Sequence, residues 1–132
     1  MKTLAFRLRP GQFLKEEIEA RSKDIPAGVL LSLVGGLEVA VLRMAGATSD
    51  KQEVKRMQGP FEIVSATGTI SADGCHIHVS VSDATGNVFG GHLKDGCIVA
   101  FTAEIVIGIL DDITFRRVPD DATGFDELDV RP

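Results

Sequence analysis

The stretch from residue 54 to residue 110 is built mostly of short segments rich in β-branched residues, with turns of only a few residues between them. The clearest segments are 61–70, 75–83, 87–93 and 97–110. Segments of this length and composition are typical of β-strands. Turns as short as Ala72-Asp73-Gly74 and Lys94-Asp95-Gly96 join consecutive strands as antiparallel neighbours. We therefore expect an antiparallel meander in this part of the chain.

The remaining segments predict further strands and one helix. Residues 3–9 alternate between apolar and polar and indicate a strand, whereas 13–23 has the pattern of a short amphipathic helix. The runs 29–34 and 37–44 predict two strands around a bend at Gly35-Gly36. A length of 132 residues suits a single core. The predicted fold class is α+β, a compact single domain over 1–132 with a largely antiparallel sheet and one or two helices packed on it.

The segment 75–83, with the sequence CHIHVSVSD, alternates strictly and therefore has one apolar and one polar face. The residues that follow suit a three-residue hairpin loop in which Gly86 takes the left-handed conformation. This loop pairs apolar with apolar residues across the hairpin: Val81 with Phe89, Val79 with Gly91 and Ile77 with Leu93. The same register sets His78 directly opposite His92.

All three histidines of the protein are expected to meet on the polar face of this hairpin. His76 and His78 are two residues apart on one strand, and His92 lies beside them on the next. Three imidazole nitrogens can bind one metal ion and leave a coordination position open. Zinc is the leading candidate, with nickel, copper or iron as alternatives. The alternative reading is a solvated sheet face with no metal.

Charge and cysteine content limit the other possibilities. The net charge is -5, from 14 Lys and Arg against 19 Asp and Glu, which disfavours a protein that binds nucleic acid through phosphates. Lys51, Lys55 and Arg56 form a basic run that could contact DNA, although a solvated face is the commoner explanation. Cys75 and Cys97 have no zinc or redox spacing, and each is read as a small buried hydrophobe.

No apolar run is long enough to span a membrane, and the charged N-terminal segment is unlike a signal peptide. We therefore expect a cytoplasmic protein without membrane contact.

Two carboxylates in apolar segments are candidate catalytic residues. Glu62 and Glu104 could act as the general base for a metal-bound water or as partners of a ligand histidine. Alternatively, each forms an ion pair with Arg43 or Arg56 or lies on an exposed face. A serine hydrolase is rejected because no serine lies in a nucleophile elbow.

Several motifs in a fixed order resemble the prokaryotic, stand-alone branch of the PPC (plant and prokaryote conserved) domain family. The motifs are GPFEIVSATGTI at 59–70, CHIHVSVSDATGNVFGGHL at 75–93, TAEIVI at 102–107 and TGFDEL at 123–128. The resemblance implies an antiparallel α/β or α+β domain that assembles as a homotrimer. Some prokaryotic members with these HxH and GGHL motifs are metal-containing proteins, which implies a metal-binding role for His76, His78 and His92.

The same resemblance brings in a DNA-binding possibility. In plants the domain is fused to AT-hook segments, and stand-alone prokaryotic members are commonly labelled as DNA-binding. This chain has no Arg-Gly-Arg-Pro core of an AT-hook.

The sequence therefore predicts a homotrimer that binds a divalent metal, zinc first, and through it a small anionic or carbonyl ligand. The alternatives are a DNA-binding or transcription-regulatory module and a metal-assisted hydrolase with Glu62 or Glu104 as base.

Overall fold

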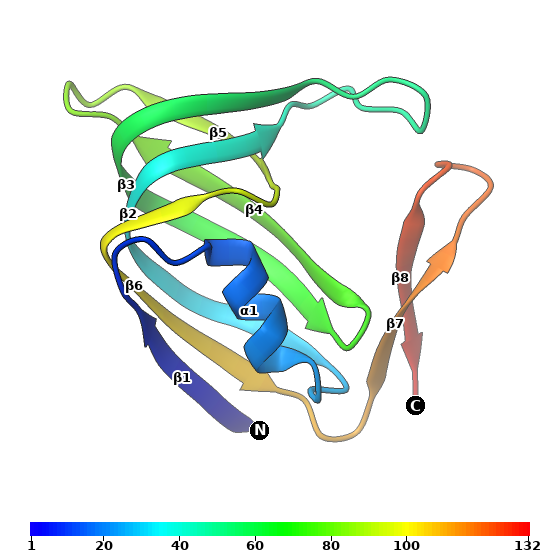
Figure 1. Cartoon of the computed structure of the whole chain (residues 1–132). Helices are drawn as coiled ribbons and strands as arrows, with labels where there is room; N and C mark the ends of the chain where they lie inside the picture. The colour runs from blue at the N-terminus through cyan, green and yellow to red at the C-terminus, as the bar shows by residue number, and fades with distance from the viewer.

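Eight strands and one short helix make up the structure, a computed structural model that describes residues 1–132 (Figure 1). In chain order they are β1 (Lys2–Leu8), α1 (Leu14–Ser22), β2 (Gly28–Arg43), β3 (Val54–Ser71), β4 (Gly74–Ser82), β5 (Val88–Leu93), β6 (Ile98–Ile109), β7 (Thr114–Pro119) and β8 (Asp126–Arg131).

Six of the strands form one antiparallel sheet in the order β1-β6-β2-β3-β4-β5. Strand β5 also pairs with the last two residues of β2, where Leu42 lies opposite Leu93 and Arg43 opposite His92. The strands β2, β3, β4 and β5 therefore close into a ring at this end of the sheet. The prediction of a compact α+β domain with a largely antiparallel sheet is confirmed. Only β2 to β5 form a meander, because β6 returns to lie on the other side of β2.

Strand β2 is a single strand of 16 residues, so the prediction of two strands around Gly35-Gly36 is wrong. The chain bends there without ending, because the pairing of β2 with β6 shifts register between the two glycines. A side chain at Gly35 would collide with the backbone carbonyl of Thr102 on β6. Gly35 thus allows β2 and β6 to approach closely at the point where their register shifts.

The apolar faces of the strands and the helix share one core. Residues on alternate positions of β4, among them Ile77, Val79 and Val81, are buried, and so are Leu14 and Ile18 of α1. The helix lies across one side of the curved sheet (Figure 1). Since α1 has nine residues, most of them polar, no helix of this structure is long and apolar enough to cross a membrane.

The last two strands form a separate hairpin that the sequence reading did not predict. Strands β7 and β8 pair only with each other and stand beside the main sheet (Figure 1). The hairpin is joined to the β3–β4 turn through Asp73, which accepts hydrogen bonds from Arg116 Nε at 2.8 Å and from the backbone N–H of Arg117 at 3.0 Å. The guanidinium of Arg117 also donates to Thr69 Oγ1 at 2.9 Å.

Candidate metal centre

The β4–β5 hairpin has the register predicted from the sequence. His78 lies opposite His92, Val79 opposite Gly91 and Val81 opposite Phe89. Gly86 adopts a φ of 87° in the connecting turn, as the three-residue loop requires. Val79 and Val81 are buried in the core, although Phe89 beside Val81 is exposed. The histidines share the other face of the hairpin.

The side chains of the three histidines converge. His76 Nε2 lies 3.1 Å from His78 Nε2, and one possible ligand atom from each of the three residues lies within 4.8 Å of those of the other two. The ring centroids are 4.8 to 5.4 Å apart. His78 is exposed, whereas His76 and His92 are partly buried. The cluster is open to solvent on one side, so a ligand can reach it.

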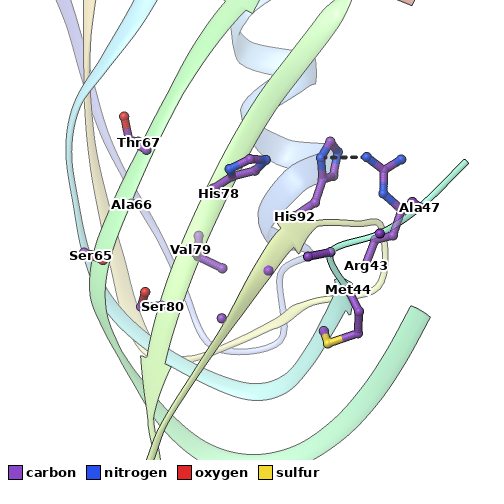
Figure 2. Close-up of a pocket in the computed structure, with 14 residues that line it drawn as sticks. Arg43, Met44, Ala47, Ser65, Ala66, Thr67, His78, Val79, Ser80 and His92 are labelled. Atoms are coloured by element: carbon purple, nitrogen blue, oxygen red, sulfur yellow. Dashed lines mark hydrogen bonds between the residues drawn. The ribbon is translucent and has the colours of Figure 1, made fainter. Parts of the chain in front are cut away.

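A continuous row of polar side chains crosses four strands at this point. Thr67 of β3 lies opposite His78, His78 opposite His92, and His92 opposite Arg43 of β2. The Nη2 atom of Arg43 is 3.4 Å from His92 Nδ1, and Figure 2 shows this contact as a dashed line. The guanidinium also lies 5.1 Å from the ring centroid of Phe125, a cation–π distance. The arginine is thereby held against the edge of the histidine cluster.

The protein environment keeps two of the histidines neutral. Burial, followed by the positive charge of Arg43, lowers the pKa of His92 to about 3. Burial and the positive charge of Arg117 also lower the pKa of His76. A neutral imidazole keeps a free lone pair, which a metal ion requires. Both residues are therefore in the protonation state of a ligand at neutral pH.

Two cavities meet at the cluster, and Arg43, His78 and His92 line both of them. The first, of about 630 Å³, is otherwise lined by uncharged and mostly small residues such as Ser65, Thr67, Ser80 and Gly90, several of which Figure 2 shows. The second, of about 500 Å³, is lined by charged groups from α1, the β3–β4 turn, β7 and β8. A ligand at the histidines would therefore meet one uncharged and one charged wall.

The donor set fits a single divalent ion. In a tetrahedral zinc site with Zn–N bonds of about 2.0 to 2.1 Å, ligand nitrogens are about 3.3 Å apart. The Nε2 atoms of His76 and His78 are already near this spacing at 3.1 Å. Cys75 lines the charged cavity, but burial raises the pKa of its thiol to about 12, so it remains protonated and a poor ligand. The three imidazoles are the fitting ligands.

The two candidate general bases lie elsewhere. Glu62 is exposed on β3 opposite Ser82, at the far end of β4 from His76, and lines a different cavity. Glu104 is exposed on β6, where it accepts a hydrogen bond from Thr102 Oγ1 at 3.2 Å. Neither forms the ion pair with Arg43 or Arg56 that was one expectation. The exposed-face reading holds for both, and within this chain neither lines a cavity at the histidines.

The basic run is also separate from the cluster. Lys51, Lys55 and Arg56 are exposed around the β2–β3 loop and the start of β3. Lys55 Nζ lies 3.9 Å from a carboxylate oxygen of Glu53, and none of the three lines a cavity at the histidines.

Sequence reasoning missed the charged and aromatic residues around the cluster, namely Arg43, Arg117, Phe125 and Glu127. The TGFDEL motif at 123–128 contains Phe125 and Glu127, yet nothing in the spacing of its residues indicated a role at the histidines. Its place beside the histidines depends on the β7–β8 hairpin, whose position no local pattern reveals.

The family model of the Plants and Prokaryotes Conserved (PCC) domain matches residues 1–111. The chain is also 43% identical over 134 residues to a bifunctional protein GlmU of Synechococcus sp. (strain JA-2-3B'a(2-13)), covering 100% of this chain and 21% of that protein. It thus spans about a fifth of the length of the curated relatives that it matches.

Solved structures share the whole fold. A hypothetical protein from Salmonella enterica has a TM-score of 0.90 at 36% identity, covering 98% of this chain and 92% of that one. A metal-containing protein from Archaeoglobus fulgidus has a TM-score of 0.83 at 30% identity, covering 97% and 93%. A "putative DNA binding protein" from Bacteroides thetaiotaomicron has a TM-score of 0.86 at 20% identity, covering 96% and 91%.

Proposed function

The chain belongs to the Plants and Prokaryotes Conserved (PCC) domain family, and from this premise we propose that it is a homotrimeric metal-binding protein. One divalent ion, for which zinc is the leading candidate, is bound by His76, His78 and His92, and a small ligand takes the open coordination position.

The observation that carries this proposal is the convergence of the three imidazoles. Their possible ligand atoms lie within 4.8 Å of one another, and the pKa values of His76 and His92 are lowered, which favours the neutral, metal-binding form. The name of the Archaeoglobus relative, a metal-containing protein with 30% identity, supports the same role. Three protein ligands leave room for an exchangeable one.

Metal analysis of the untagged protein tests the proposal, since a histidine tag would itself bind metal. We expect close to one zinc ion per chain. Loss of a group that is hydrogen-bonded to a metal ligand typically weakens metal binding about 10- to 100-fold. His78→Ala should weaken zinc binding by more than this, because it removes a ligand itself. Ser80→Ala is the matched control, since Ser80 lies on the same strand and the same cavity. Native protein without stoichiometric metal would contradict the proposal.

A DNA-binding or regulatory role is the second candidate, and it rests on the exposed basic residues Lys51, Lys55 and Arg56 and on the name of the Bacteroides neighbour. The net charge of -5 weighs against it. A gel-shift titration at two salt concentrations decides, because binding through phosphates must weaken steeply as salt rises. Absence of any shift at low salt removes this candidate.

A further inference from the structure

Three positively charged side chains beside the histidine cluster have no carboxylate partner. Arg43, Lys94 and Arg117 line the charged cavity together with the histidines, and none of them takes part in an ion pair. They come from β2, from the turn after β5 and from β7, so three separate parts of the chain bring positive charge to one place.

The carboxylates of the same cavity only partly balance this charge. Glu19 is occupied by Lys15 at 2.9 Å and by the backbone N–H of Cys75 at 2.9 Å. Asp73 is bound to the β7–β8 hairpin through Arg116. Glu19 and Asp73 therefore stabilise the fold. The other two carboxylates that line the cavity, Asp126 and Glu127, form no ion pair.

Arg43 is the best placed of the three cations. It lies opposite His92 in the β2–β5 pairing, its Nη2 atom is 3.4 Å from His92 Nδ1, and its guanidinium stacks against Phe125. The contact with Phe125 holds the planar group at the edge of the cluster. When His92 binds a metal, its ring has no second lone pair for Arg43, so the five N–H donors of the guanidinium are free for a ligand. A planar guanidinium binds carboxylate and phosphate oxygens through paired hydrogen bonds.

We propose that the centre takes a small oxyanion, with one oxygen in the open position of the metal and others bound by the guanidiniums of Arg43 and Arg117. This inference rests on the proposed metal site. A divalent ion held by three neutral imidazoles keeps its full charge of about +2, so with the unpaired arginines the pocket attracts an anion. The uncharged cavity lined by Ser65, Thr67 and Ser80 receives the remainder of the ligand. Carboxylate and phosphate share the chemistry that this arrangement recognises.

The test uses the untagged protein loaded with cobalt(II), whose visible absorption reports both metal binding and a change of ligand at the metal. Titrations with malonate, with inorganic phosphate and with neutral malonamide follow. We expect malonate, phosphate or both to change the spectrum in a saturable way, and malonamide to have no comparable effect. The two anions show which oxyanion is preferred.

Variants then test the arginines. Arg43→Met should weaken oxyanion binding about 10- to 100-fold, the range for losing hydrogen bonds to a charged group, with cobalt binding retained. Arg117→Met should weaken it in the same direction. Arg9→Met is the matched control, because it removes the same charge at an exposed position outside both cavities.

Each result has a distinct meaning. Oxyanion affinity that survives Arg43→Met unchanged, or a cobalt protein whose spectrum no oxyanion alters, overturns the oxyanion proposal and leaves the metal site standing. Failure of the wild-type protein to bind cobalt or zinc at all overturns the metal site and the oxyanion proposal together.

Discussion

Asp83 is the residue that fixes the turn between the two histidine strands. Its carboxylate accepts hydrogen bonds from the backbone N–H groups of Thr85 and Asn87, each at 2.9 Å, and from both of their side chains. Desolvation acts to raise the pKa of Asp83, but these hydrogen bonds outweigh it and the pKa lies below its ordinary value of 3.8. The folded turn therefore stabilises the ionised form of the Asp83 carboxyl group.

This pKa predicts how the effect of Asp83→Asn depends on pH. A carboxyl group with a lowered folded pKa stabilises the fold above its unfolded pKa, and the stabilisation is lost as pH falls through the lower folded value. We expect Asp83→Asn to lower the thermal midpoint at pH 7, and the difference from wild type to shrink as pH is lowered towards about 3. Asp121→Asn, on the exposed β7–β8 turn, is the control. A difference that stays constant over this pH range would argue against the assigned hydrogen bonds.

At the scale of single residues, the sequence predicted contacts between residues that are close along the chain and missed contacts between residues that are far apart. The pairing of His78 with His92 follows from one short loop and the alternation of its strands, and it is confirmed. Arg43 lies 49 positions from His92, and Arg117 approaches from a hairpin that pairs with no other strand. Their place beside the histidines depends on how distant strands pack, which no local periodicity encodes.

At the scale of elements, Gly35 is the position that most affects how strand β2 pairs with its neighbours. The strand pairs with β3 along one side and with β6 and β5 along the other, and Arg43 at its end reaches the histidines. Gly35 allows β6 to come close at the point where its register shifts. The same glycine pair misled the sequence reading, because glycines that end a strand and glycines that admit a close neighbour are alike in sequence.

Gly35→Ala should therefore destabilise the fold by about 2 to 4 kcal/mol, combining overpacking with backbone strain. The physical reason is the collision of the new methyl group with the carbonyl of Thr102. Chemical denaturation measures the change. Gly46→Ala is a sharp control, since Gly46 has a φ of 88° but open space around it, so it reports the conformational cost alone. Equal losses in the two variants would show that close approach is unimportant at Gly35.

For the whole molecule, several large apolar side chains lie exposed on the outer surface. They include Leu31, Val34, Val64, Val88, Phe89 and Phe101. Phe101 is 80% exposed and has a φ of 63°, a conformation that a bulky residue adopts only at a cost. Its backbone carbonyl accepts a hydrogen bond from Arg7 at 3.1 Å, which helps to hold this conformation. A strained, exposed phenyl group in one chain is explained if a second copy covers it.

The proposed homotrimer then yields a final prediction at Phe101, which lines a cavity together with Val34. Phe101→Asn removes the exposed ring and substitutes a residue that tolerates a positive φ. We expect light scattering after gel filtration to give three times the chain mass of 14.1 kDa for the wild type and a lower, concentration-dependent mass for the variant. The isolated chain should lose little stability, because the ring is hardly buried within it. Val130→Asn, which replaces another exposed apolar side chain on β8, should leave the trimer intact. A monomeric wild type, or a Phe101→Asn trimer as stable to dilution as the wild type, would contradict an interface at this face.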